Sequence, residues 1–141
     1  MQLTSFTDYG LRSLLYLAAL PEGERSNIQA VSERFSIPKN HLIKIINKLA
    51  QLGYIQATRG KYGGIILGKP AEQIVVGQVV RDLEPLQLID CSESACHITS
   101  ACRLKAQLAK AKEAFLYQLD QCTLADLLDN NDDLVLLLTP V

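Results

Sequence analysis

Three of the four cysteines of this chain lie in one stretch of thirteen residues, DCSESACHITSAC, from Asp90 to Cys102. The thiols of Cys91, Cys96 and Cys102 follow the spacing Cys-x4-Cys-x5-Cys, and His97 lies among them as a further metal-binding side chain. Thiolates bind zinc and iron, form disulfides and act as nucleophiles. The stretch is therefore a metal site, a redox switch, a disulfide loop or a chance cluster, and the rest of the chain has to distinguish these alternatives.

The composition indicates one compact domain, or a small domain with an extension, and a reducing compartment. The chain has 141 residues, of which 48% are hydrophobic. No apolar run approaches the roughly 18 residues that a membrane span needs, and the first ten residues, MQLTSFTDYG, lack the pattern of a signal peptide. We therefore expect a cytoplasmic protein without membrane attachment, in which clustered thiols bind metal more often than they form disulfides.

The spacing of the thiols favours an iron–sulfur cluster over zinc. Zinc sites usually carry paired Cys-x2-Cys knuckles. Zinc could take the three thiols and His97, but the adjacent Cys96 and His97 would then have to bind one ion in an awkward geometry. An iron–sulfur cluster suits spaced thiolates on a loop and needs a fourth ligand from elsewhere. A catalytic thiol would need a positioned base and an oxyanion site, for which the sequence gives no support.

The two halves of the chain differ in charge. Residues 1–70 hold nine Lys and Arg against four Asp and Glu, whereas residues 71–141 hold five against eleven. A basic half suggests contact with a polyanion such as nucleic acid, although ordinary surface scatter gives the same numbers. Motifs have to decide between these two interpretations.

The basic half has the element order of a winged helix-turn-helix. Thr4 suits the N-cap of a helix that runs to about Leu20, Ser26 or Asn27 suits the N-cap of a second, short helix, and Pro38 suits the first position of a third. Two strand-like runs, YIQATRG and GIILGK, then flank a basic, glycine-rich turn. In this architecture the second helix of the motif enters the major groove, and here that helix is the third of the chain.

The third helix should have one apolar face and one polar, basic face without acidic residues. The apolar face comprises Leu42, Ile45, Ile46, Leu49 and Leu52. Side chains near the start of the helix meet base edges, and Asn and Lys carry suitable donors. The candidate DNA contacts are Lys39, Asn40, His41, Lys44 and Lys48 on the helix and Arg59 and Lys61 on the wing. Taken one at a time, the helix face could be merely solvated, the hairpin a plain turn, and His41 partly buried.

The acidic half should hold a helix over 76–84, the cysteine loop, a helix of about twenty residues and a final short helix with a tail. Ser100 suits the N-cap of the long helix, which would place Cys102 in its first turn, where the helix dipole favours a thiolate. Cys122 lies on an apolar face and is expected to be a small core residue. The long helix carries a narrow, Ala-rich stripe that either packs on its own domain or pairs with a second copy.

These elements predict a mainly α fold with a small β-hairpin wing and a long C-terminal dimerisation helix. Residues 1–70 would form the DNA-binding domain, and residues 71–141 the cluster-binding loop and the dimerisation region. Helix-turn-helix proteins usually dimerise to read two half-sites, so we expect a homodimer on a palindromic double-stranded operator.

From end to end the chain resembles the family of winged-helix iron–sulfur transcription regulators that includes IscR and NsrR. The residues that carry the resemblance are MQLTSFTDYGLRSLLYLA, the wing RGKYGGIILGKP with its RG-x-x-GG pattern, the three-cysteine loop and the long helix. In the IscR branch a histidine ligand follows the last cysteine by three residues, but that position is Lys105 here. The sequence therefore looks closest to the NsrR branch of nitric-oxide-sensitive repressors.

The resemblance implies a ligand set and a signal. Cys91, Cys96 and Cys102 would bind the iron of the cluster, and the fourth ligand of NsrR-like proteins, a carboxylate from the first helix of the partner subunit, matches Asp8. Three cysteines and an aspartate fit a 4Fe–4S cluster in this family, and the 2Fe–2S form stays open. Nitric oxide would dismantle the cluster and release the operator. Read alone, Asp8 is a carboxylate that the dipole favours near a helix N-terminus, without any metal.

Three alternatives remain open at this point. One is an IscR-like regulator that reports iron or cluster status without responding to nitric oxide. Another is a zinc-stabilised or cluster-free winged-helix module that binds constitutively. A thiol redox enzyme is the third, for which a thiol of low pKa with turnover would be required.

Overall fold

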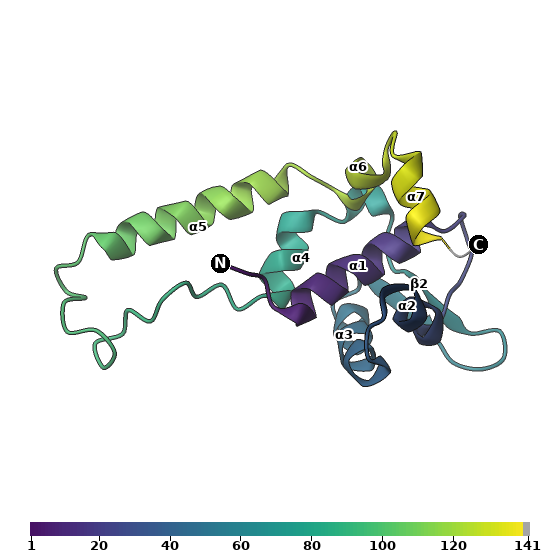
Figure 1. Cartoon of the computed structure of the whole chain (residues 1–141), viewed down its shortest axis with the longest axis horizontal. Coiled ribbons are helices and arrows are strands. Elements are labelled where there is room, and N and C mark those ends of the chain that lie inside the picture. The colour runs from purple at the N-terminus through teal and green to yellow at the C-terminus, as the bar shows by residue number, and fades with distance from the viewer. Residues whose placement is uncertain (140–141) are drawn as a thin grey trace.

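One long helix projects from a head of shorter helices (Figure 1). In Figure 1, an irregular loop runs from the head out to the far end of this helix, and the helix leads the chain back to the head. The computed structural model describes residues 1–139. In chain order the elements are α1 (Ser5–Ala19), α2 (Ile28–Phe35), α3 (Lys39–Gln51), β1 (Ile55–Thr58), β2 (Gly64–Leu67), the 3-10 helix η1 (Ala71–Gln73), α4 (Val76–Leu83), α5 (Leu104–Asp120), α6 (Leu124–Leu128) and α7 (Asp132–Leu138). Across the described residues, no helix combines the length and the apolar character that crossing a bilayer requires.

The first two helices begin at capping residues that the sequence indicated. The Thr4 side chain accepts a hydrogen bond from the backbone N–H of Thr7, and Asn27, rather than Ser26, accepts one from Ala30 at 2.8 Å. Both caps satisfy N–H groups that a helix start leaves without partners. The structure confirms the expected boundaries of α1 and α2 to within one residue. They could be predicted because each cap involves only residues that are close in the sequence.

The helix α3 and the wing also form as expected. Pro38 lies immediately before α3 instead of at its first position, which shifts the predicted start by one residue. Strands β1 and β2 pair antiparallel, and the chain ahead of α2 joins them through a two-way bridge between Ser26 and Ile65. A side chain at Gly64 would meet the carbonyl oxygen of Ser26 at 2.4 Å, so only glycine fits this close approach.

The core of the head draws on both halves of the chain. The buried residues Leu14, Val31, Leu42, Ile46 and Leu49 come from α1, α2 and α3. The same cluster includes Ile74, Val79 and Leu124, which lie beyond residue 70. Each fully buried aliphatic side chain contributes about 1.5–3 kcal/mol, so packing across residue 70 is a substantial part of the stability of the head.

The long helix begins later than the sequence suggested. Its first residue is Leu104, Arg103 precedes it as the N-cap, and no side chain caps it. The prediction that Ser100 caps this helix is therefore wrong. The reason is that the preceding residues are engaged in tight turns, in which the N–H of Ala101 bonds the carbonyl oxygen of Ile98 at 3.1 Å. Cys102 consequently lies ahead of α5 and not in its first turn, so the dipole of α5 does not account for a thiolate there.

The C-terminal segment forms two helices where the sequence suggested one short helix and a tail. Thr123 and Asp126 form a capping box at the start of α6, and Asn131 caps α7 by accepting from the N–H of Leu134. Both helices return to the head and contact α1. Arg34 of α2 donates to backbone carbonyls at the end of α7, including that of Leu138 at 3.2 Å. The last two residues, 140–141, lie outside the described part.

Candidate cluster loop and DNA-binding surface

The cysteine loop lies at the end of α5 that points away from the head (Figure 1). The three thiols of the loop are free and half-buried. Short local bonds shape the loop, among them one from the Thr99 hydroxyl to the carbonyl oxygen of Cys91 at 2.6 Å. Ser92 donates its backbone N–H to Asp90 at 2.9 Å, and hydrogen bonds from Ser92 lower the pKa of Asp90. The loop is thus held by its own turns.

The three thiols do not form a ligand set in this conformation. Within residues 1–139, no three His, Cys, Asp or Glu side chains lie close enough together to hold a metal ion. The chemistry of the donors nevertheless fits an iron–sulfur cluster, because three unpaired thiols share a segment with no helix or strand between Leu83 and Leu104. Such a segment can close around a ligand, so binding would gather Cys91, Cys96 and Cys102 and reorder the loop.

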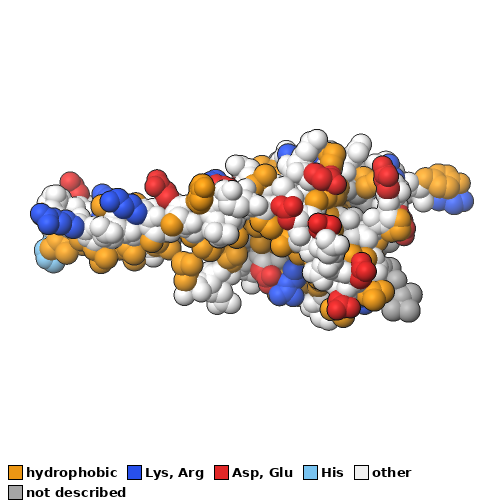
Figure 2. Space-filling model, turned by 90° about the horizontal axis from the view of Figure 1, so that it is seen from above, with side chains coloured by type: hydrophobic (Ala, Val, Ile, Leu, Met, Phe, Trp, Pro, Cys, Tyr) orange, Lys and Arg blue, Asp and Glu red, His pale blue; other side chains and the backbone are white. Residues whose placement is uncertain are grey.

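Hydrophobic side chains line the arm formed by α5 and the cysteine loop, as Figure 2 shows along one edge of the molecule. Large aliphatic side chains next to the thiols are exposed in the single chain, namely Leu88, Ile89, Ile98 and Leu104. Tyr117 near the other end of α5 is 67% exposed. An exposed apolar band of this length is typical of a surface that a second protein covers.

The carboxylate of Asp8 faces solvent near the start of α1. Its side chain is 41% exposed and accepts from Nε of Arg12 at 2.8 Å, an i,i+4 pair on one helix face. Asp8 is not brought together with the thiols of its own chain. The pairing of Asp8 with Arg12 was not predicted from the sequence, although their i,i+4 spacing is a recognisable signal.

The carboxylate of Glu84, the residue that follows α4, anchors the start of α1. The backbone N–H and the hydroxyl of Thr4 donate to Glu84 at 3.0 and 2.9 Å, and the hydroxyl of the fully buried Thr7 donates to the same oxygen. Burial opposes ionisation of Glu84, but the hydrogen bonds from Thr7 and Thr4 outweigh it and lower its pKa. Glu84 therefore joins the turn that precedes Asp8 to the point where the cysteine loop leaves α4.

The candidate DNA contacts share exposed positions on α3 and the wing. All of Lys39, Asn40, His41, Lys44 and Lys48 are exposed on α3, and Arg59 and Lys61 are exposed between β1 and β2. The alternative of a partly buried His41 is thereby excluded. Both elements lie on the lower side of the head in Figure 1. The structure adds Tyr62 at the wing tip, 85% exposed and with its ring centroid 5.6 Å from Nζ of Lys61.

The half-buried Cys122 is a packing residue, as expected. It packs beside Val76, Val80 and Leu116, and its thiol donates to the carbonyl oxygen of Thr123 at 3.5 Å. Burial, with a smaller contribution from Asp126, raises the pKa of this thiol. Cys122 is thus chemically distinct from the loop cysteines and serves as a natural control for them.

Comparison with known proteins places this architecture in a family. The sequence model of the Rrf2 family, described as an iron-dependent transcriptional regulator, matches residues 3–130. The chain belongs to the Rrf2 family. Its helical fold with an antiparallel two-stranded hairpin is the winged-helix fold of that family, which confirms the predicted fold class. This Rrf2 protein is a DNA-binding transcriptional regulator and not an enzyme, and regulators of this family are typically dimeric.

Several solved structures resemble the Rrf2 chain over most of its length. IscR of T. potens is 26% identical, with a TM-score of 0.75 over 94% of this chain and 90% of that one. CymR of Staphylococcus aureus is also 26% identical, with a TM-score of 0.73 over 89% of this chain and 97% of that one. CymR of B. subtilis, described as the global cysteine regulator, is 24% identical, with a TM-score of 0.73 over 90% and 95% of the two chains.

We predict that Glu84→Gln lowers the stability of this Rrf2 regulator by about 1–2 kcal/mol at pH 7, because two hydroxyls and one N–H lose a charged acceptor. Since the folded pKa of Glu84 lies below its ordinary value, the ionised carboxylate stabilises the fold above that value. This contribution is lost as the pH falls through the folded pKa. Urea unfolding at several pH values should therefore show wild type and Glu84→Gln converging in acid. Two results would contradict the stabilising role of Glu84. One is a difference in unfolding free energy between wild type and Glu84→Gln that stays constant with pH, and the other is an equal loss of stability in the exposed-surface control Glu72→Gln.

We also predict that Arg59→Ala weakens operator binding about tenfold and reduces the slope of log affinity against log salt by about one, as expected for one lost phosphate contact. The operator would first be selected from random duplexes. Lys110→Ala, which removes an exposed cation of α5, is the matched control and should bind like wild type. If both variants bind equally, the assignment of Arg59 to DNA is wrong.

Proposed function

We propose that this Rrf2 regulator is a repressor of the NsrR type, which holds an iron–sulfur cluster on its cysteine loop and releases its operator in response to nitric oxide. The observation that carries the proposal is the set of three free, half-buried thiols on one irregular loop, in a chain whose family is described as iron-dependent. When bound, the cluster supplies iron with which nitric oxide reacts. The chain's own residues supply the ligands and connect them to the DNA-binding head.

The fourth ligand is proposed to be Asp8 of the partner subunit. The loop itself offers three thiols, and Lys105 replaces the histidine that serves IscR-like proteins. Asp8 is accessible at the surface, and Arg12, its present partner, lies on the same exposed helix face. The cysteine loop lies at the far end of α5 from the head of its own chain (Figure 1). A ligand donated by a second copy is therefore more readily placed than one from the same chain.

Ligation by Asp8 would couple the loop of one subunit to the head of the other. Asp8 lies one helical turn after Thr4, which Glu84 ties to α4. The helix α1 also packs against α3, the recognition helix. A displacement of Asp8 would therefore move α1 and, through their packing, the recognition helix α3. Such coupling requires two arrangements of the dimer, of which the ligated one binds the operator.

The dimer is proposed to form through the apolar band on α5. Two heads held by paired helices would present two recognition helices to half-sites about one helical turn, roughly 34 Å, apart. A palindromic operator follows from this symmetry. The exposed aliphatic residues beside the thiols would then be covered by the partner, which would exclude water from the cluster.

Two other functions would use the same architecture. An IscR-like regulator of iron or cluster status would bind the cluster but keep its operator affinity in nitric oxide. The 26% identity to T. potens IscR favours this alternative. A zinc-stabilised module would hold zinc and no sulfide. Metal and acid-labile sulfide analysis of anaerobically purified protein separates the zinc-stabilised module from a cluster protein. The Mössbauer spectrum of a cluster protein then distinguishes 4Fe–4S from 2Fe–2S.

Replacing any loop cysteine with serine should abolish cluster retention. We predict that Cys91→Ser, Cys96→Ser and Cys102→Ser each lose at least about nine-tenths of their iron and sulfide, because thiolate ligation holds the cluster. The matched control Cys122→Ser should retain both, since that thiol packs among hydrophobic residues. Iron retained in all three loop variants, together with nitric oxide responses like wild type, would exclude the proposed site.

The identity and the origin of the fourth ligand can be tested together. We predict that Asp8→Ala homodimers bind the operator at least about tenfold more weakly and lose the cluster faster. An Asp8→Ala subunit is then combined with a subunit in which Cys91, Cys96 and Cys102 are serine. Donation between subunits predicts one complete site per mixed dimer and about half of the wild-type iron. Donation within a subunit predicts none, and unchanged iron in the Asp8→Ala homodimer would reject Asp8 as a ligand.

A further inference from the structure

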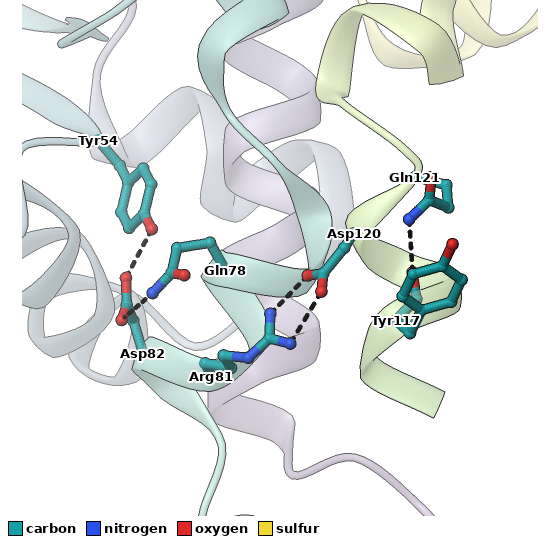
Figure 3. Close-up of polar contacts among 7 residues, drawn as sticks. All are labelled: Tyr54, Gln78, Arg81, Asp82, Tyr117, Asp120 and Gln121. Atoms are coloured by element: carbon teal, nitrogen blue, oxygen red, sulfur yellow. Dashed lines mark hydrogen bonds and ion pairs between the residues drawn. The ribbon is translucent and has the colours of Figure 1, made fainter. Parts of the chain in front are cut away.

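A buried tyrosine ties the base of the wing to α4 (Figure 3). The hydroxyl of Tyr54, the residue before β1, donates to Oδ2 of Asp82 at 2.5 Å, and the side chain of Tyr54 is 3% exposed. The other oxygen of Asp82 accepts from Gln78 at 3.0 Å. Strand β2 also ends at Tyr54, because the N–H of Gly68, the residue after β2, donates to the carbonyl oxygen of Tyr54 at 2.8 Å. Both strands of the wing therefore meet at Tyr54.

The opposite end of this connection lies on the last turn of α5. Arg81 binds both carboxylate oxygens of Asp120, with Nη2 at 2.8 Å from Oδ2 (Figure 3). The N–H of Val76 donates to the carbonyl oxygen of Cys122 at 2.8 Å. A side chain at Gly77 would lie 2.0 Å from Oδ1 and 2.9 Å from the backbone nitrogen of Asp120, so α4 and the end of α5 approach each other closely at this position. The contact is thus fixed by charge and by shape.

The two connections meet on neighbouring residues of one short helix. Arg81 and Asp82 both belong to the last turn of α4, so a displacement of α5 that moves Arg81 must also move Asp82. Burial raises the pKa of Tyr54 well above its ordinary value, and the hydrogen bond to Asp82 raises it further. The phenol therefore stays protonated and keeps donating at any physiological pH. Among the described residues, the side-chain donor to Oδ2 of Asp82 is the Tyr54 hydroxyl, while Gln78 donates to Oδ1.

We propose that Tyr54, Asp82, Arg81 and Asp120 are positioning residues that set the wing according to the position of the C-terminal end of α5. A hydrogen bond from the wing base to α4, and an ion pair from α4 to α5, connect the DNA-contacting hairpin to the helix that carries the cysteine loop. The importance of this relay for operator binding rests on the wing contact proposed above. The existence of the relay does not, because it is a property of the chain itself.

Contacts other than the relay also hold the wing, so loss of the relay should loosen the wing only in part. Ser26 bridges Ile65, and Nη1 of Arg25 donates to the Thr58 hydroxyl at 3.2 Å. Both hold the wing to the chain ahead of α2 and neither involves α4. Loss of the relay should therefore loosen the wing without unfolding the head.

The relay can be tested by amide hydrogen exchange on the full-length protein, without DNA and without a cluster. Exchange would be followed in a peptide spanning 54–69 of four proteins, namely wild type and the variants Tyr54→Phe, Arg81→Gln and Lys110→Gln. Loss of a hydrogen bond to a charged group should speed exchange by up to about tenfold through local opening, in Tyr54→Phe and also in Arg81→Gln. Lys110 is an exposed cation of α5 outside the relay, so Lys110→Gln, the matched control for Arg81→Gln, should exchange like wild type.

The response to Arg81→Gln is decisive, because Arg81 does not contact the wing. Faster exchange confined to α4 and α5, with the wing at the wild-type rate, would overturn the relay. Should Arg81→Gln fail to fold, Arg81→Lys keeps the charge while losing the two-point bond. A smaller acceleration in the wing then supports the proposal, and no acceleration again overturns it.

Operator binding tests whether the relay positions the wing for DNA. Arg59→Ala should cost about tenfold in the wild-type background but less than about threefold when combined with Tyr54→Phe, because a misplaced wing makes less use of Arg59. An equal cost in both backgrounds would overturn the positioning role. If Arg59→Ala costs nothing in either background while exchange behaves as expected, the proposed wing contact fails and the relay itself stands.

Discussion

The contact between α4 and the last turn of α5 is so close that position 77 has no room for a side chain. A Cβ there would lie 2.0 Å from Oδ1 of Asp120 and 2.9 Å from its backbone nitrogen, and Arg81 grips the same carboxylate from the next turn. This contact fixes the direction in which α5 leaves the head (Figure 1). It therefore also decides where the cysteine loop lies, since the loop runs from the end of α4 to the start of α5.

In that direction the loop lies away from the head (Figure 1), and in the described residues its thiols are not gathered into a ligand set. It carries three suitable thiols far from the carboxylate on α1 of its own chain, and it leaves them apart while nothing gathers them. Under the proposed function, a ligand supplied by another copy would make cluster binding report on the geometry of the dimer. Glu84 connects the start of the helix that carries Asp8 to the root of the loop. The proposed sensing function would use this incompleteness of the site in one chain.

What could be predicted from the sequence was local. The caps at Thr4 and Asn27, the apolar face of α3 and the hairpin all depend on residues within a few positions of each other. The start of α5 was missed because a serine that could cap lies among turns that use up its neighbours' N–H groups, and α7 was missed because the cap at Asn131 follows another helix so closely. The contacts of Glu84 with Thr4 and of Tyr54 with Asp82 join residues 80 and 28 positions apart, and no pattern in the sequence encodes such pairs. The thiols were visible in the sequence, but their separation in space was not.

The central claim is that operator affinity depends on the cluster bound by the cysteine loop and is lost in nitric oxide. The most direct measurement titrates anaerobically purified dimer with nitric oxide while recording the iron–sulfur absorption and operator binding on the same sample. The account predicts that the absorption band is lost and that binding falls in parallel with it, by at least about tenfold. Binding that persists after the band has disappeared, or a protein that binds its operator equally well without any iron, would contradict the account.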